Sequence, residues 1–260
     1  MTDRIATIEE ALLNSMPAEK TVLLGGWVLR MNRNYTYRAN CVCPLRYQSG
    51  AALPEKVEAC EELFLKNRLP PVFKVTPVLQ EGLAGFLLSR GYRKIKTVRA
   101  MLRGQAPDPP AAPPGGVEIE SAEAPGPEWL RASVSLSGVT DPALAAVHRG
   151  NLKNIAVASV FVSAAAGGRI VGCGYGTAER GFAGIYDLHV DPEFRRRGIA
   201  TAICRKIFGF GARRGAGFSY LIVHSKNRNA ISLYSHLGFV PLYDYDFYVR
   251  PAGGYRIFDA

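Results

Sequence analysis

The chain has 260 residues, of which 48% are hydrophobic and 21% charged, an ordinary composition for one large or two small globular cores. The net charge of +10 makes anionic partners plausible: a polyphosphate ligand, acidic lipid or nucleic acid. The basic residues form neither a long run nor a series alternating with aromatic residues, so a nucleic-acid partner is disfavoured.

The N-terminal sequence and the hydropathy pattern both argue against membrane insertion. Residues 1–16 carry acidic side chains and lack the apolar core of a signal peptide. No segment approaches the ~20 apolar residues that a membrane-spanning helix needs. We therefore expect a cytoplasmic protein with no membrane partner.

Five cysteines are present, and only Cys41 and Cys43 are close together in sequence. Neither a second pair nor nearby histidines complete a tetrahedral metal site. The pattern predicts no metal, and small free thiols, buried or half-buried, in a reducing compartment.

A proline-rich segment, residues 104–116, divides the chain. Such a segment is extended and cannot join a hydrophobic core. It predicts a first domain over residues 1–103 and a second over residues 117–260, each of ordinary domain size.

Beyond this segment, hydrophobic periodicity predicts a mixed α/β domain. In chain order we expect a strand at 116–122, helices at 126–138 and 141–152, strands at 158–164, 169–178 and 181–190, a helix at 198–214, a strand at 218–225, a helix at 229–237 and a strand at 244–250. Asp141 followed by Pro142 is typical of a helix start. The helix at 198–214 should bury Ile199, Ile203, Ile207 and Phe210 on one face.

Three consecutive arginines, Arg195 to Arg197, separate a predicted strand from the glycine that opens this helix. The first turn of a helix offers unpaired N–H groups and the positive end of the helix dipole. Gly198 and Ala200 leave room for the oxygens of an anion, and arginines can add charge-assisted hydrogen bonds. Taken alone, a run of arginines favours a solvated basic surface. Here, however, the run lies between a predicted strand and a predicted helix, and this position favours a phosphate site.

Two motifs in this half resemble the GNAT superfamily of N-acetyltransferases. Arg195, Gly198 and Ala200 match the family's phosphate signature, Arg/Gln-x-x-Gly-x-Gly/Ala. Residues 227–239 match its later signature, Asn-x-x-Ala-x-x-Leu-Tyr-x-x-x-Gly-Phe, at every fixed position. The resemblance covers about residues 117–250. It implies a mixed, mostly antiparallel central sheet with a splayed parallel pair and flanking helices.

The resemblance implies an acyltransferase that moves acetyl from acetyl-CoA to an amine by direct attack on the thioester. The donor would lie where the strands ending near Val190 and Val223 separate. The residues implied to contact it are Leu188, His189, Val190, Arg195, Arg196, Arg197, Gly198, Ile199, Ala200, Thr201 and Asn227.

Two residues are implied to be catalytic. Tyr234 would protonate the departing thiolate, with a core aromatic as the alternative interpretation. Asp187 would remove the proton of the amine, and Glu179 is the alternative base. Strand alternation places Asp187 and Val190 on opposite faces unless a bulge intervenes. His189 fits an acid–base role or a structural one equally well.

The first half repeats parts of this pattern at a nearly constant offset, which predicts a tandem, diverged GNAT-like unit. Its donor site is degenerate, because Tyr47 or Gln48 stands in place of Arg195 and Leu87 in place of Tyr234. The matching pairs are Val42-Cys43-Pro44 with Val190-Asp191-Pro192, Gly50 with Gly198, Ala52 with Ala200, Val75 with Val223, and Gly91-Tyr92 with Gly238-Phe239.

In tandem members of the family the inert half supports the fold or shapes the acceptor site. That role would make Trp27, Tyr35, Tyr37 and Arg38 candidates for substrate contact, although Trp27 equally fits a core position. The run Tyr243, Tyr245, Phe247 and Tyr248 favours packing over an acceptor pocket.

Several points stay open from sequence. The acceptor is a small amine or a peptide or protein amine, and the acyl-chain length and oligomeric state are undetermined. The alternative function is a non-catalytic acyl-CoA-binding sensor or interaction protein.

Overall fold

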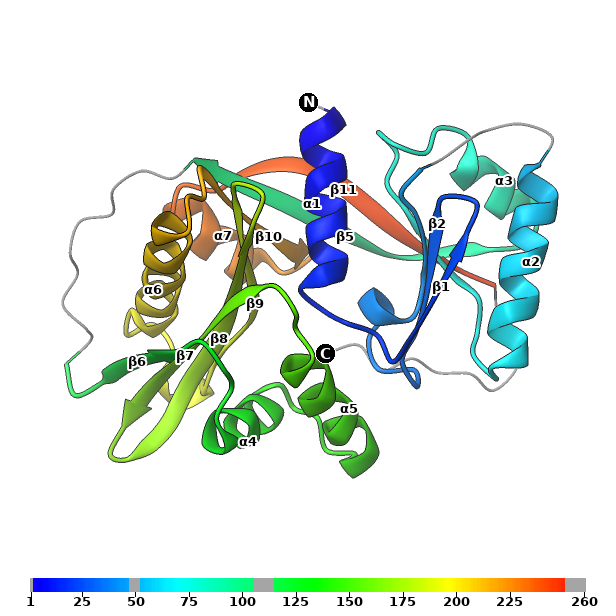
Figure 1. Cartoon of the computed structure of the whole chain (residues 1–260). Coiled ribbons are helices and arrows are strands. Elements are labelled where there is room, and N and C mark those ends of the chain that lie inside the picture. Colours follow the sequence, from blue (N-terminus) through cyan, green and yellow to red (C-terminus); the bar gives the residue numbers. More distant parts are fainter. Residues whose placement is uncertain (1, 47–51, 105–114, 251–260) are drawn as a thin grey trace. The chain divides into compact units, whose positions relative to one another are not determined.

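The computed structural model describes residues 2–46, 52–104 and 115–250, and the chain forms two compact units (Figure 1). The first contains residues up to Ala100, His224–Lys226 and the residues from Tyr243 on, and the second contains Met101–Val223 and Asn227–Leu242. Strands β5 (Arg93–Gly104) and β11 (Val240–Val249) therefore each contribute to both units. The predicted domains had assigned each of these strands to one half. Most of the proline-rich segment lies outside the described residues.

The second unit contains five neighbouring strands of the sheet, in the order β10-β9-β8-β7-β6. Neighbouring strands are antiparallel except β9 and β10, which are parallel. The strands are β6 (Glu118–Ala122), β7 (Ala158–Ala166), β8 (Arg169–Glu179), β9 (Phe182–Val190) and β10 (Phe218–His224). This arrangement confirms the predicted mixed sheet with one parallel pair.

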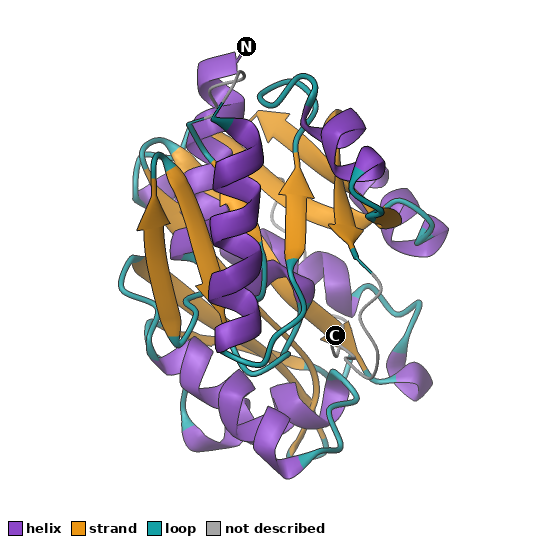
Figure 2. Ribbon diagram, turned by 90° about the vertical axis from the view of Figure 1, so that its right-hand side faces the viewer, coloured by secondary structure: helices purple, strands orange, loops and turns teal. Residues whose placement is uncertain are grey.

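Helices pack against the strands of this sheet (Figure 2). On one face α6 covers β8 and β9, and on the other the Trp129 indole of α4 donates a 2.9 Å hydrogen bond to the Val162 carbonyl. Asp141 caps α5 as predicted, accepting from the Ala143 amide at 2.7 Å. The helices are α4 (Pro127–Leu136), α5 (Pro142–Lys153), α6 (Ile199–Arg213) and α7 (Arg228–His236).

Helix α6 lies very close to β8, and glycines make this approach possible. The predicted apolar face of α6 is buried as expected. A Cβ at Gly172 would lie 3.0 Å from Cγ2 of Ile199, and one at Gly176 would collide with Cγ2 of Ile207. The spacing of alternate glycines along β8 therefore sets the position of α6 on the sheet.

Gly176→Ala is expected to destabilise the protein by about 1–3 kcal/mol, because the added methyl group overpacks the contact with Ile207. Gly209→Ala is the matched control on α6, where the nearest atom to an added Cβ lies at 3.5 Å. Helix propensity makes that change neutral or stabilising by up to about 1 kcal/mol. Chemical denaturation measures both, and equal losses would show that close packing is not what requires glycine at position 176.

The first unit repeats the element order of the second. Its sheet has the order β1-β2-β3-β4-β11, with β3 and β4 parallel through the pair Val42 and Phe73. The series β3-α2-β4-α3-β5 corresponds to β9-α6-β10-α7-β11, which confirms two tandem units of one fold. Its other elements are α1 (Thr2–Asn14), β1 (Lys20–Leu24), β2 (Trp27–Met31), η1 (Tyr37–Ala39), β3 (Val42–Pro44), α2 (Leu53–Lys66), β4 (Val72–Val75) and α3 (Leu83–Ser89).

The aromatic residues of the first unit are mostly structural. Trp27 is fully buried and its ring centroid lies 6.2 Å from that of Phe73, so the core interpretation of Trp27 is the one the structure shows. Tyr35 is also buried, and Tyr37 packs against Phe247 at 5.5 Å. The four aromatic residues of the β11 run are buried, which confirms packing.

All five cysteines are free and buried, as predicted. In the parts of the chain that the structure describes, no helix is long and apolar enough to cross a bilayer. Tyr47, Gln48 and Gly50 of the sequence repeat lie outside the described residues.

Candidate active site

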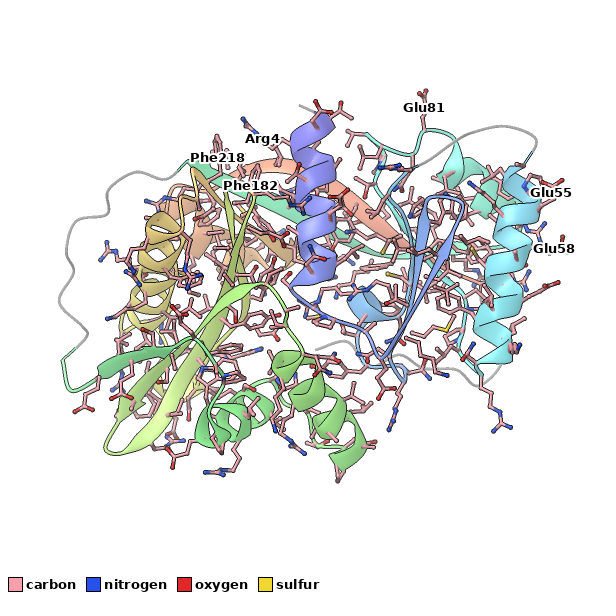
Figure 3. The ribbon with its side chains drawn as sticks, in the orientation of Figure 1. Arg4, Glu55, Glu58, Glu81, Phe182 and Phe218 are labelled. Atoms are coloured by element: carbon pink, nitrogen blue, oxygen red, sulfur yellow. The ribbon has the colours of Figure 1, made fainter. Side chains whose placement is uncertain are left out.

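The parallel strands β9 and β10 separate at the end nearest the predicted donor site. Their register begins with Phe182 and Phe218, labelled in Figure 3, whose rings stack at 5.7 Å. It ends with Ile185 and Leu221, although β9 runs on to Val190 and β10 to His224. From Tyr186 on, β9 is paired on its other side with β8. Leu188, His189 and Val190, predicted to contact the donor, lie half-buried along this separated segment.

A β-bulge interrupts β9 at Asp187. The register with β8 shifts between Cys173 and Tyr175, and Asp187 has φ of 44°, in the left-handed region. Consequently Ile185, Leu188 and Val190 all pack against the α6 core, a spacing that simple alternation does not produce. A non-glycine residue held at positive φ stores strain, a feature concentrated at functional sites.

The turn between β9 and α6 is built by side chains near its start. Asp191 caps the short helix η2 (Pro192–Phe194) through a 3.1 Å hydrogen bond from the Glu193 amide, and Arg169 pairs with Asp191 at 2.9 Å. Gly198 then adopts φ of 82°, a conformation that favours glycine. Helical pairing begins with the Ala202 amide, which donates to the Gly198 carbonyl. The N–H groups of residues 199–201 precede it and have no helical acceptor.

The three arginines of this turn have different environments, although all three are exposed. Arg195 Nε donates to the Val190 carbonyl at 3.1 Å, and Arg197 Nη2 donates to the Glu193 carbonyl at 3.0 Å. Within the described chain, the Arg196 side chain has no hydrogen bond or ion pair. Two of the arginines therefore brace the loop, which leaves the backbone amides as the best-placed direct ligands of an anion.

Asn227 and Tyr234 take their positions from α7. The Asn227 side-chain oxygen caps this helix by accepting from the Ala230 amide at 3.1 Å, a role that the sequence interpretation did not include. Tyr234 is 9% exposed and packs edge-on against Phe239 at 6.0 Å. Burial raises the pKa of Tyr234, and the neighbouring Cys204 and Asp187 raise it further. The phenol is therefore protonated at neutral pH.

The two predicted catalytic residues, Asp187 and Tyr234, interact electrostatically. The charge of Asp187 influences the pKa of Tyr234 and also that of Cys173, so Asp187 lies within electrostatic reach of both. Glu179, the alternative base, pairs with Arg180 at 3.1 Å near the opposite end of the β8–β9 hairpin. Glu179 lies four residues along β8 from Tyr175, where the bulge begins, which is a distance of roughly 13 Å. Glu179 is thus not part of this cluster.

Two features of the second unit were missed from sequence. The hydroxyl groups of Tyr186 and Tyr220 hydrogen-bond to each other, and the Tyr186 ring covers Gly184, where a Cβ would collide with it. Cys204 on α6 lies close enough to Tyr234 to raise its pKa. One sequence signal was available for the tyrosine pair: Gly184 stands two residues before Tyr186, on the same strand face, where a glycine leaves room for a large ring. In the described ranges, no cluster of three or more His, Cys, Asp or Glu side chains could hold a metal ion.

Comparison with solved structures defines the class. A GCN5-related N-acetyltransferase from Kribbella flavida superposes with a TM-score of 0.70 at 16% identity, covering 97% of this chain and 96% of that one. A tandem GNAT protein from the clavulanic acid biosynthesis pathway gives a TM-score of 0.67 at 17% identity, covering 95% and 88%. The fold is therefore that of the GNAT acetyltransferases, and its two-unit form has a precedent.

Sequence comparison gives the family. The uncharacterized N-acetyltransferase YobR of Bacillus subtilis (strain 168) is 25% identical over 258 residues, which cover 95% of this chain and 99% of the relative. Residues 2–248 match the family described as "Probable histone acetyltransferase Rv0428c C-terminal". The chain belongs to this family and is an N-acetyltransferase of the GNAT type.

Proposed function

We propose that the second unit transfers an acetyl group from acetyl-CoA to an amine, which attacks the thioester directly. The observation that supports this proposal best is the separation of β9 and β10 beside the exposed N-terminus of α6. A strand edge next to a helix start offers hydrogen-bond donors for an extended amide chain and, directly beyond it, for a pyrophosphate.

The donor side of the site would use backbone groups. Acetyl-CoA supplies the acetyl group and a thiol leaving group. The segment Leu188–Val190 would pair with the amides of its pantetheine arm, and the N–H groups of Ile199, Ala200 and Thr201 would bind its pyrophosphate. Arg195, Arg196 and Arg197 would add positive potential around that anion. Asn227, which caps α7, and His189 would complete the lining.

Tyr234 would act on the leaving group. An ordinary thiol has a pKa of about 8.5 and an ordinary phenol one of about 10. Because its surroundings raise the pKa of Tyr234, this phenol would keep most of its proton. It would therefore stabilise the departing sulfur by donating a hydrogen bond rather than by giving up its proton.

Asp187 would prepare the amine. A typical alkylammonium group has a pKa of about 10.4 and carries no lone pair, so it must lose a proton before it can attack. The half-buried Asp187 carboxylate lies on the separated part of β9, within electrostatic reach of Tyr234. It would accept this proton directly or through a water molecule.

The first unit would be an inactive copy that supports the fold. Leu87, fully buried on α3, occupies the position that corresponds to Tyr234 and has no proton to donate. We therefore propose one donor site per chain, in the second unit. We keep the proposed domains, residues 1–103 and 117–260, as the approximate bounds of these roles, although β5 and β11 contribute to both units.

The acceptor is proposed only as a class, an amine. The family description names histone, a polycationic protein, whereas this chain itself has a net charge of +10. Long-range repulsion disfavours a polycation, so we give priority to small amines.

Calorimetric titration of acetyl-CoA into the full chain tests the donor site, followed by an assay of thiol release with small amines and a lysine-rich peptide. The full chain is required because Met101, fully buried in the core of the second unit, is missing from a 117–260 fragment. Binding with amine-dependent thiol release supports the enzyme. If acetyl-CoA binds but no tested amine causes thiol release, the result supports the sensor. Absence of binding contradicts the proposed donor site.

A further inference from the structure

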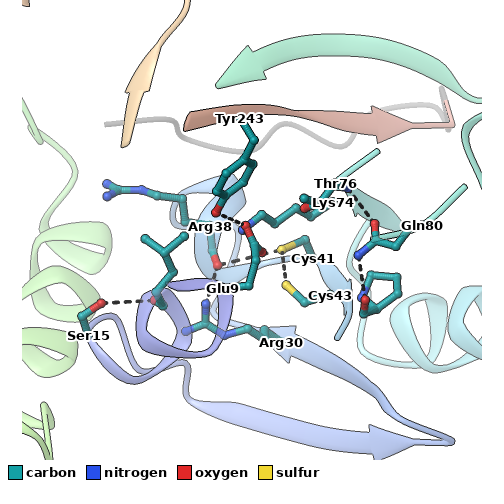
Figure 4. Close-up of polar contacts among 12 residues, drawn as sticks. Glu9, Ser15, Arg30, Arg38, Cys41, Cys43, Lys74, Thr76, Gln80 and Tyr243 are labelled. Carbon is teal, nitrogen blue, oxygen red and sulfur yellow. Dashed lines mark hydrogen bonds and ion pairs between the residues drawn. The ribbon is translucent and has the colours of Figure 1, made fainter. Parts of the chain in front are cut away.

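The first unit buries a polar cluster on one face of its sheet (Figure 4). The opposite face is apolar, because Leu29, Val42 and Phe73 pack there with α2 and α3. Strand alternation turns the intervening residues, Arg30, Cys41, Cys43 and Lys74, to the side of α1. All four are at most 5% exposed.

Charged groups in this cluster are fixed by specific partners. Glu9 of α1 accepts from Lys74 Nζ at 2.5 Å and from the Tyr243 hydroxyl at 2.6 Å. Arg30 donates to the main-chain carbonyls of Arg38 and Met16. Burial alone would lower the pKa of Lys74, but the Glu9 carboxylate and then Tyr245 and Cys43 raise it. The ammonium therefore stays charged next to the thiols.

The two thiols lie in contact, with Sγ of Cys41 3.4 Å from Sγ of Cys43. The Cys41 hydrogen bond lowers the pKa of Cys43; burial opposes this shift, and Lys74 and Arg30 reinforce it. The pKa of Cys41 is raised, chiefly by burial. These directions make Cys43 the candidate nucleophile of the pair and Cys41 its hydrogen-bond partner.

Backbone geometry permits a bond between these sulfurs. Strand residues two apart have Cα atoms about 6.6 Å from each other. That separation is inside the upper limit of roughly 6.8 Å for disulfides. Cys41 lies just before the first residue of β3, Val42. Its backbone can therefore adjust as the bond between the two sulfurs forms.

A cavity of about 390 Å³ lies on the side of the first unit's sheet that faces α1, and its lining does not include Cys41 or Cys43 themselves. Its lining includes Val28, the register partner of Cys43, together with Arg30, Leu45 and Thr21. Leu45 follows the last residue of β3, and its amide donates to the Cys43 carbonyl at 3.0 Å. The cavity therefore approaches Cys43 through Val28, on the same side of the sheet.

We propose that Cys41 and Cys43 are an oxidisable dithiol that closes to a disulfide when the protein meets a hydroperoxide. This site is separate from the proposed acetyl-transfer site, and nothing in the acetylation chemistry uses it.

The reaction balances in two steps. The Cys43 sulfur attacks the peroxide oxygen of ROOH, which gives a sulfenic acid, and the departing RO⁻ takes the Cys43 proton to form ROH. The Cys41 sulfur then attacks the Cys43 sulfur and expels hydroxide, which takes the Cys41 proton to form water. Two thiols are oxidised by two electrons in total, and the peroxide bond is reduced.

Peptide mapping of the full chain after treatment with hydrogen peroxide tests the proposal. Cleavage after Arg38 and Arg46 releases a peptide, residues 39–46, that contains no other cysteine. After alkylation, this peptide should be two hydrogen atoms lighter than its reduced, unalkylated form, and dithiothreitol should restore its reactivity. Cys60, Cys173 and Cys204 should remain alkylatable.

The other buried thiols provide the rate comparison. Burial raises the pKa of Cys60 to about 12 and that of Cys173 to about 12. The pair should therefore react at least about tenfold faster than either, because the thiolate is the reactive form. The proposal would be overturned if the pair were oxidised no faster than Cys60. It would also be overturned if Cys43 advanced to sulfinic acid and no disulfide formed.

Two variants sharpen the result. Cys41→Ser should stop at a Cys43 sulfenic acid that dimedone traps, whereas Cys60→Ser, the matched control in the same unit, should form the disulfide at the wild-type rate. A Cys41→Ser protein that still loses two thiols would show that Cys43 pairs elsewhere and would also contradict the assignment. Each readout is a mass, so failure of the acetyltransferase proposal would leave this test unaffected.

Discussion

Gly198→Glu is expected to weaken acetyl-CoA binding by at least about a hundredfold, equivalent to roughly 2.7 kcal/mol. The new carboxylate would stand at the start of α6, where the pyrophosphate is proposed to lie, and would repel it. Its Cβ would also strain a backbone held at φ of 82°. Calorimetric titration with acetyl-CoA measures the change.

The matched control is Gly215→Glu, because Gly215 follows the other end of the same helix and has φ of 76°. Both glycines are exposed, so both variants should lose similar stability, about 1–2 kcal/mol, from the left-handed conformation. Only the change at position 198 should affect binding. Wild-type affinity in Gly198→Glu would remove the α6 N-terminus from the donor site.

Tyr234→Phe is expected to lower kcat by about a hundredfold while leaving the dissociation constant of acetyl-CoA unchanged. The ring that packs against Phe239 is retained, and only the hydrogen-bond donor to the departing sulfur is lost. Steady-state kinetics with an amine that the wild-type enzyme accepts measures kcat, and calorimetry measures affinity. Full activity of this variant would mean that another group stabilises the thiolate.

Tyr248→Phe, which removes a buried phenol in the first unit, provides the control and should retain wild-type kcat. The pH profile adds an independent check. Since the pKa of Tyr234 is raised, its ionisation should cause no alkaline loss of kcat below about pH 10. A loss that begins near pH 8 and disappears in Tyr234→Phe would contradict the assignment.

The parts of the site predictable from sequence are those set by local chemistry. An aspartate cap and the apolar face of α6 each leave a signal within a few residues, and both were found, at Asp141 and Ile203. Gly198 was singled out for the room it leaves, and its positive φ is a finding of the structure. The two motifs lie on such segments, which explains why the fold of the second unit could be anticipated closely.

The remaining features depend on long-range pairing. The bulge at Asp187 arises from the register of β9 against β8, which no pattern within β9 alone specifies. The bracing of the loop by Arg195 depends on where the Val190 carbonyl lies after folding. Pairing of β11 with β4 joins Asp246 to Val75 across most of the chain, so local periodicity could not reveal it.

That pairing has a consequence for synthesis on the ribosome. The first unit is translated first, but its sheet includes β11, and its buried Glu9 bonds to Tyr243 near the end of the chain. Until those residues emerge, β4 lacks one of its two partner strands and the Glu9 carboxylate lacks one of its two donors. We therefore expect the N-terminal unit to complete its fold only after β11 has left the ribosome, reversing the usual order in which domains mature.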